Sequence, residues 1–147
     1  MSESTARSIP PISPGLFRQE AETITLIGGF SEGSGYAHFP IQDLCPFTGE
    51  GDVTLIDLPT EGSLCSWTEV TVAPPGYFGD VPYGFGIVEL PIDQAGSANQ
   101  LRVVTRLKLA NTAPRIGLPM TLIADVVADS DNEPRTTWAF RPTEPAQ

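Results

Sequence analysis

The chain has 147 residues, which suits one domain, and it carries 8 basic against 18 acidic side chains, a net charge of -10. General nucleic-acid binding is not expected, because phosphate contacts need clustered Lys and Arg. The 14 glycines and 15 prolines make up about one residue in five, which excludes a helix bundle and favours a β-rich fold with many turns.

The sequence also bears on location and redox chemistry. No apolar stretch approaches the ~18 residues of a membrane-spanning helix, and the opening MSESTARSIPP lacks the apolar segment of a signal peptide. We therefore expect a cytoplasmic protein that does not bind membranes. The two cysteines, Cys45 and Cys65, allow one disulfide at most, so the chain is not a disulfide scaffold.

In chain order, residues 1–22 form a polar, proline-rich arm in which residues 16–22 could make one or two helical turns. Apolar runs and turn signals then predict strands at 23–30, 35–40, 53–59, 63–73, 85–91, 100–110, 116–128 and 135–142. The glycine-rich segment Gly28–Gly35 leads into another extended stretch and not into a helix, which favours a turn over a phosphate cradle. Residues 143–147 are a short polar tail.

The later strands suit a small Greek-key barrel of the OB type, with long and irregular loops. The clearest alternation is QLRVVTRLKLA (100–110), which places Val103 on one face and Arg102 and Arg106 on the other. The apolar phases predict a core made of Leu64, Val70, Val72, Ile87, Leu101, Val103, Leu107, Leu122 and Val126.

Candidate catalytic residues are few. His38 is the sole histidine, it follows aromatic Tyr36 in the run YAHFP, and the chain has no nucleophile turn of the G-x-S-x-G kind. A strand residue is therefore the preferred interpretation of His38. Nothing in the sequence argues for an enzyme that acts alone.

Several short motifs follow one another in an order that resembles a known family. They are SEGSG (31–35), FP (39–40), CPFTG (45–49), GSLCSWT (62–68), PPGYF (74–78), PY (82–83), VEL (88–90) and GLPM (117–120). Together they resemble the acyl-CoA-associated OB-fold family first catalogued as domain of unknown function 35. The resemblance implies a rubredoxin-like zinc ribbon followed by a five-stranded OB barrel, so we divide the chain into an arm (1–22), a ribbon (23–60), a barrel (61–142) and a tail (143–147).

The resemblance fails at the metal ligands. Positions that hold zinc thiolates in the family are Ser31, Ser34, Cys45 and Thr48 here, and hydroxyls do not replace thiolates as zinc ligands at neutral pH. We expect a degenerate ribbon that binds no zinc. A site rescued by Cys45, His38 and Cys65 is an alternative that the residues disfavour.

Members of the family are non-catalytic companions of thiolase-fold enzymes. The resemblance thus implies a subunit that assembles with a thiolase or an acyl-CoA retro-aldolase, often as an α2β2 heterotetramer, and helps form the acyl-CoA channel. The coenzyme A thioester would be the substrate of the complex, and this chain would hold no cofactor of its own.

Two groups of residues are candidates for such contacts. The aromatic group, which either docks a partner or caps the open end of the barrel, is Tyr77, Phe78, Tyr83 and Phe85. The basic group is Arg102, Arg106, Lys108 and Arg115. It could contact the phosphates of coenzyme A or an acidic partner, and the alternative is that it forms a solvated strand face.

Two other classes of function stay open at this point. An OB module that binds single-stranded nucleic acid or oligosaccharide alone is the main alternative, although the charge argues against nucleic acid. A free-standing hydrolase or thioesterase built on His38 or Cys45 has no supporting motif.

Overall fold

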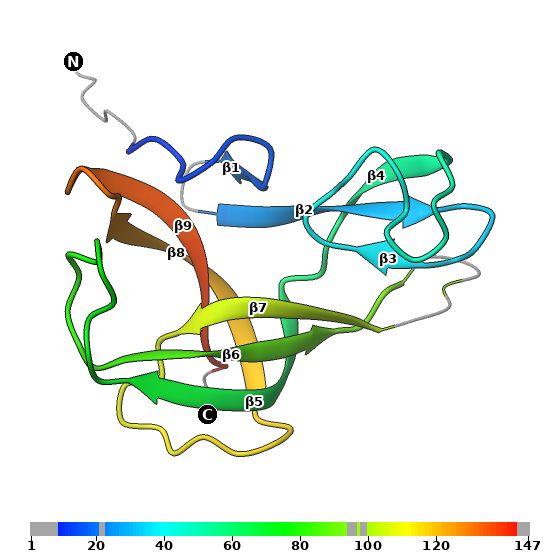
Figure 1. Cartoon of the computed structure of the whole chain (residues 1–147). Coiled ribbons are helices and arrows are strands. Elements are labelled where there is room, and N and C mark those ends of the chain that lie inside the picture. Colours follow the sequence, from blue (N-terminus) through cyan, green and yellow to red (C-terminus); the bar gives the residue numbers. More distant parts are fainter. Residues whose placement is uncertain (1–8, 21–22, 94–96, 98–99, 144–147) are drawn as a thin grey trace.

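The computed structural model describes residues 9–20, 23–93, 97 and 100–143, and in these ranges the chain is built from strands alone (Figure 1). The strands are β1 (Phe17–Glu20), β2 (Thr23–Ser31), β3 (Ala37–His38), β4 (Val53–Asp57), β5 (Glu61–Val70), β6 (Tyr83–Leu90), β7 (Leu101–Leu107), β8 (Pro119–Ala128) and β9 (Pro134–Pro142). The described residues thus include no helix that could cross a membrane.

The second half of the chain closes into a five-stranded barrel in the order β5-β6-β7-β9-β8. All neighbours are antiparallel except β7 and β9, which run parallel, and β8 returns to β5 to complete the circle. The structure therefore confirms the predicted five-stranded OB-type barrel.

The first half forms a small four-stranded sheet around β2, beside the barrel (Figure 1). β1 and β3 pair with β2 along one edge and β4 pairs along the other. The expectation of helical turns in residues 16–22 is wrong for 17–20, which are β1. Pairing with β2 explains this, since it supplies the backbone partners of β1 while Phe17 packs against the core.

The described part of the arm adds to β9. Ile12 donates its amide to the Thr136 carbonyl at 2.8 Å, and the Thr136 amide donates to the Pro10 carbonyl at 2.7 Å. β9 pairs with β7 only at residues 139–140, so the arm lies along a part of β9 that β7 does not reach.

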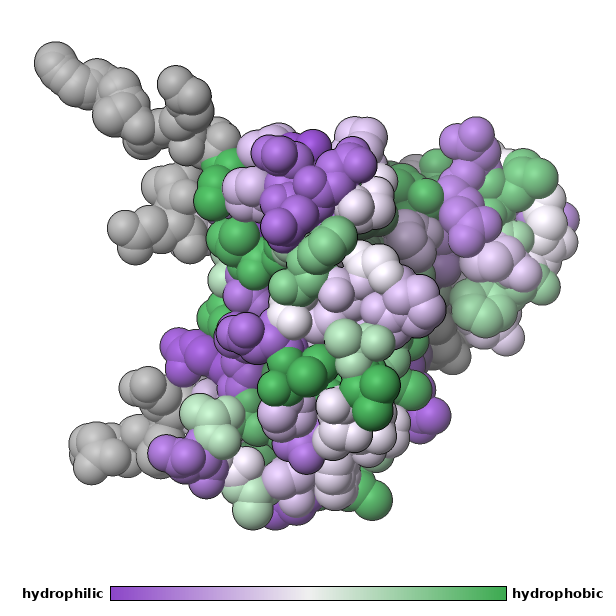
Figure 2. Space-filling view, turned by 60° about the vertical axis from the view of Figure 1, so that its left-hand side comes forward, coloured by the Kyte–Doolittle hydropathy of each residue, from purple (hydrophilic) through white to green (hydrophobic). Residues whose placement is uncertain are grey.

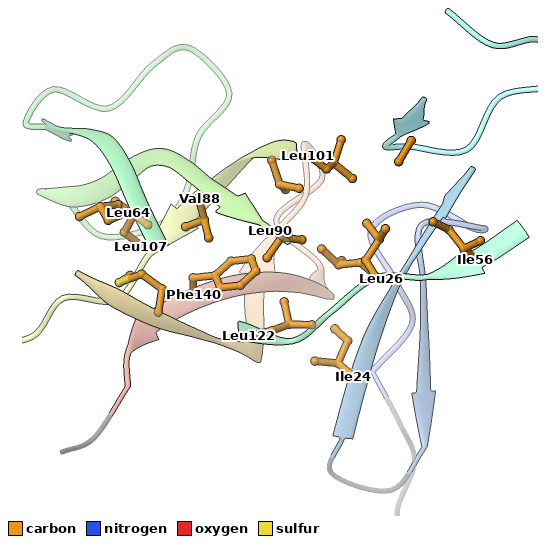
Figure 3. Close-up of a cluster of buried hydrophobic side chains, with 14 of the residues drawn as sticks. Ile24, Leu26, Ile56, Leu64, Val88, Leu90, Leu101, Leu107, Leu122 and Phe140 are labelled. Atoms are coloured by element: carbon orange, nitrogen blue, oxygen red, sulfur yellow. The ribbon is translucent and has the colours of Figure 1, made fainter. Parts of the chain in front are cut away.

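One hydrophobic core runs through both sheets (Figure 3). Inside the barrel Phe140 and Val88 are fully buried, and Leu26 from β2 joins the same cluster from the small sheet. Phe39, which follows β3, sets its ring edge-on against Trp138 of β9 at 5.3 Å. The two sheets are therefore held together by shared packing.

The predicted core is confirmed at Leu64, Leu101, Val103, Leu107 and Leu122, which are all buried. The prediction is wrong for β6, where Val88 and Leu90 point inward and Ile87 is only half-buried. The burial in β6 alternates regularly, and its pairing with β7 places Val88 opposite the buried Val103 and Ile87 opposite the exposed Val104. Because both phases of β6 carry apolar residues, alternation within the strand does not reveal which phase faces inward. In β5 the faces change at a β-bulge at Cys65, where Leu64 pairs with Val88 but Ser66 pairs with Ile87, and simple alternation cannot foresee that change.

The other errors lie where strands leave the barrel. Val70 is half-buried at the end of β5, and Val72 lies beyond the strand with 79% of its surface exposed. Val126 is exposed because β8 pairs with β5 only over Pro119–Thr121, so its second half extends beyond the barrel wall. These residues surround the open end of the barrel and not its interior.

Candidate functional site

The open end of the barrel holds a hollow of about 880 Å³, which we call the barrel mouth. It lies where β5 ends, where β6 begins and where β7 and β8 leave the barrel, under the loop that joins β5 to β6. The side chains used below are Trp67, Tyr77, Tyr83, Arg106, Lys108 and Val126. Figure 2 turns this side of the molecule forward and shows hydrophobic and hydrophilic residues interspersed over it.

Two of the four predicted aromatic residues meet at the mouth. The rings of Tyr77 and Tyr83 lie 5.0 Å apart at an angle of 39°, and the Tyr77 hydroxyl donates to the Asp80 carbonyl at 3.0 Å. Gly76, with a φ of 81°, makes the turn that returns Tyr77 toward the barrel. The tyrosines therefore line the hollow.

The other two predicted aromatic residues face solvent. Phe78 is 52% exposed on the loop, and Phe85 is 39% exposed on the outer face of β6, where it pairs with Arg106. The structure thus divides the group into two lining rings and two exposed ones.

Two of the four predicted cations also reach the mouth. The guanidinium carbon of Arg106 lies 4.9 Å from the centroid of the Tyr83 ring, within the range of a cation–π contact. Arg106 Nε and Lys108 Nζ each lie 3.4 Å from one carboxylate oxygen of Asp125. The Asp125 side chain is only 13% exposed, so this carboxylate and two cations form a compact charged group at the rim.

The remaining two predicted cations lie elsewhere. Arg102 is near the start of β7, about 13 Å along the strand from Arg106, and its Nε lies 3.5 Å from Glu89. Arg115 is exposed in the loop before β8. The four basic residues therefore do not form one cluster.

Sequence reasoning missed Asp125 and Trp67 as residues of this site. Asp125 is the single carboxylate within the apolar run of β8, and that isolation was the available signal. Trp67 follows the bulge and pairs with Gly86, where the backbone of β5 comes so close that a β-carbon would collide with the Ser66 carbonyl oxygen. No local pattern predicted the exposure of Trp67, because the bulge changes the faces.

His38 lies far from the mouth, in the small sheet, and is buried. Its Nε2 accepts a hydrogen bond from the Gln42 amide at 3.1 Å, and burial lowers the pKa of the ring. Its ring packs over Gly29, where a β-carbon would collide with it. These contacts are those of a neutral packing residue.

The four degenerate ribbon positions lie in two similar turns. The Gly35 amide donates to the Ser31 carbonyl at 2.7 Å, and the Gly49 amide donates to the Cys45 carbonyl at 2.8 Å. The two glycines have φ values of 80° and 78°. Tyr36, next to the first turn, stacks on Phe47 of the second turn at 4.9 Å.

Polar side chains hold these turns. The Cys45 thiol is buried, and its pKa is lowered by the Thr48 hydroxyl, by the Phe47 and Thr48 amides and by the Ser34 hydroxyl, against the effect of burial. Within the first turn, the Gly33 amide donates to Asp52 at 2.7 Å. The Gly33 amide, which a phosphate bound at this turn would need as a donor, is thus already bonded to the Asp52 carboxylate.

This donor set does not fit zinc. Three of the four positions offer neutral hydroxyls, and Cys45 is the single thiol among them. Across the described chain, no three residues of the types His, Cys, Asp and Glu are grouped so as to hold a metal ion.

Comparison with known proteins gives one family match. Residues 55–124, which include β5, β6, β7 and half of β8, match the family model of the C-terminal OB-fold domain of ChsH2. This part of the barrel is therefore similar to the ChsH2 OB-fold domain. A comparison of the sequence with curated proteins gives no match.

Among solved structures, one similar chain is described as the Ltp2-ChsH2 (DUF35) aldolase. The TM-score is 0.59 and the sequence identity is 24%, over 80% of this chain and 84% of that chain. The OB-fold of the barrel is thus shared with that protein.

Proposed function

We propose that this chain is a non-catalytic OB-fold subunit of an enzyme complex that processes coenzyme A thioesters. The observation that carries the proposal is the match of residues 55–124 to the ChsH2 OB-fold domain. The partner is a thiolase-fold subunit that supplies the catalytic groups, either for thiolysis or for retro-aldol cleavage, in an α2β2 heterotetramer. This chain itself holds no cofactor and no zinc.

The barrel mouth is the part of this subunit that we assign to the acyl-CoA channel. Tyr77 and Tyr83 offer flat apolar surfaces, and Arg106 and Lys108 offer charge to a phosphate that approaches the rim. The exposed Phe78 and Phe85 continue this surface outward and serve as partner contacts. Fixing a long thioester in this way positions it for the partner's catalytic groups.

The subunit contributes no catalytic group in this proposal. Carbon–carbon cleavage of a thioester needs a nucleophile or base, a second acid–base group and an oxyanion hole. His38 is committed to packing and to Gln42, and Cys45 is committed to its turn.

A stand-alone nucleic-acid module is less well supported. Arg102, Arg106 and Lys108 each face a carboxylate in the chain itself, which reduces the positive field that a phosphate backbone would need.

Purification of the tagged full chain from its native cells tests the proposal. We expect a thiolase-fold protein to co-elute, and acyl-CoA turnover in the complex but none in the isolated chain. Turnover by the isolated chain, or co-elution of single-stranded nucleic acid alone, contradicts the proposal.

Variants refine the test. Replacing Tyr77 and Phe78 together by Ala should weaken assembly or raise KM, whereas Cys65→Ala, at a residue that does not line the mouth, should leave the chemical step intact. A selective loss of kcat in Cys65→Ala within an intact complex would place this chain in the chemistry.

A further inference from the structure

The strand β4 has one unpaired edge within the described chain. The Leu58 amide donates to the Leu26 carbonyl at 2.9 Å, and alternate residues of a strand direct their backbone groups to opposite edges. Thr54 and Ile56 therefore bond to β2. The amide and carbonyl groups of the other three residues, Val53, Leu55 and Asp57, point to the outer side. No other strand of the described residues pairs with β4 on that side.

This edge lacks three common protections of an exposed strand, namely Lys, Pro and a bulge. An exposed edge strand is normally blocked by Lys, by Pro or by a bulge. The sequence of β4, VTLID, has neither Lys nor Pro, and its pairing with β2 is regular. At its centre Leu55 has 58% of its surface exposed. Val53, Leu55 and Asp57 thus offer both backbone partners and an apolar side chain to an added strand.

The surroundings of this edge are acidic. Residues 23–60 contain five acidic residues and no Lys or Arg, and their single histidine is the buried His38. The carboxylate of Asp57 forms an ion pair with Arg18 of β1, which lies outside this segment, with 2.6 Å between Oδ2 and Nη2. Glu32 lies beside Thr54, with 3.5 Å between its Oε2 and the Thr54 hydroxyl. An added strand would therefore meet a negative field.

We propose that the free edge of β4 docks an extended segment of a partner protein, in which Lys or Arg flank apolar residues. The added strand would pair with Val53, Leu55 and Asp57, and its cations would face the acidic small sheet. This site lies in the small sheet, away from the loop between β5 and β6 that covers the barrel mouth (Figure 1). It is independent of the proposed acyl-CoA role.

Charge excludes a second copy of this chain as the preferred occupant. Two copies paired through β4 would bring together two small sheets that have no Lys or Arg in residues 23–60. Like charges across an interface are costly, so a cationic partner is favoured over self-association.

Two short peptides test the proposal against the full chain by fluorescence anisotropy. Both alternate Val and Thr, and one carries Lys at both ends where the other carries Glu. We expect the Lys peptide to bind at least about tenfold more tightly, and its affinity to fall when salt is raised from about 50 to about 300 mM. Hydrogen exchange at the Val53 and Leu55 amides should slow when this peptide binds.

A matched pair of variants isolates the edge. Leu55→Pro removes an outward amide without removing a hydrogen bond to β2, and it should lower the affinity at least about tenfold. Leu55→Thr keeps that amide and should bind nearly as the native chain does.

Three outcomes overturn the proposal. They are equal binding of both peptides, full binding by a folded Leu55→Pro variant, and unchanged exchange at Val53 and Leu55 in the native chain with peptide. If those amides are already protected in the free chain because it forms dimers, the occupant is a second copy and the proposal is wrong.

Discussion

The hydroxyl of Ser31 donates a hydrogen bond of 2.7 Å to Oδ1 of Asp52, the residue just before β4. The other oxygen of Asp52 accepts the Gly33 amide at 2.7 Å. The sequence resemblance assigns a zinc thiolate of the family to the position of Ser31. Here the first turn is fastened by a carboxylate from the segment that follows the second turn, so the two ends of the degenerate site remain linked.

This link predicts a dependence of stability on pH. The Ser31 hydroxyl, and after it the Gly33 amide, hold the pKa of Asp52 below its ordinary value. A carboxyl with a lowered folded pKa stabilises the fold above its unfolded pKa of about 4, and this contribution is lost as pH falls through the folded value. Asp52→Asn should therefore lower Tm at neutral pH and reduce the fall of Tm toward acid.

Thermal unfolding between neutral pH and about pH 2 measures both effects. Asp129 has its pKa lowered in the same direction by the Glu133 amide first, so the slope should shrink in Asp52→Asn without vanishing. Asp43→Asn, in an exposed loop, is the matched control and should retain the native slope. An unchanged slope in Asp52→Asn would contradict the assignment.

The two turns also predict a gain of metal binding. Because the Ser31 and Cys45 turns share the same backbone hydrogen bond and glycine conformation, cysteines at Ser31, Ser34 and Thr48 should join Cys45 as a four-thiolate site. The triple variant should bind one Zn²⁺ per chain and raise Tm, and with Co²⁺ it should show the absorption of tetrahedral thiolate coordination. The native chain should bind neither ion. One tightly held zinc per native chain would refute the predicted loss.

Periodicity was enough to predict β7. Its alternation is unbroken, so Val103 is buried while Val104 is 53% exposed. It failed at β5 because the bulge at Cys65 is one inserted residue, with no Gly or Pro to mark it. It also failed at Val126, whose exposure depends on where β5 stops pairing with β8. Contacts between distant strands set both features, and a local pattern does not contain them.

The sequence predicted several residues of the candidate site but not how these residues are arranged. Tyr77, Tyr83, Arg106 and Lys108 were predicted and do meet at one hollow. Asp125, which lies beside both cations, comes from β8, of which the sequence analysis singled out only Leu122 and Val126. Its role depends on β8 lying near β7 through β9, which is a property of the barrel order and not of any motif.

Adjacent residues of β7 allow a direct test of the barrel core. Val103→Ala removes two buried methyl groups and should lower the free energy of unfolding by about 1–3 kcal/mol. Val104→Ala, on the exposed face of the same strand, should change it by less than about 0.5 kcal/mol. Chemical denaturation of both variants measures the difference. Equal losses would mean that the inward and outward faces of β7 are not distinguished as the structure has them.

The last prediction concerns Gly29 and His38, which pair across β2 and β3. A β-carbon at Gly29 would collide with Nε2 of the His38 ring and would come within 2.9 Å of Val53 Cγ1. Gly29→Ala alone should therefore destabilise the chain by about 1–3 kcal/mol, as overpacking of a filled space does. His38→Ala alone should also destabilise it, because the ring's packing and the bond from the Gln42 amide are lost.

Combining the two changes separates packing from other causes. With the ring removed, the methyl group added by Gly29→Ala has the space that His38 occupied, so Gly29→Ala should cost less in the His38→Ala background than in the native chain. The contact with Val53 should keep that cost above zero. A double-mutant cycle measured by denaturation should give a coupling of about 0.5–3 kcal/mol. Additive losses would show that His38 does not fill the space above Gly29, and its role in the small sheet would then have to lie outside this contact.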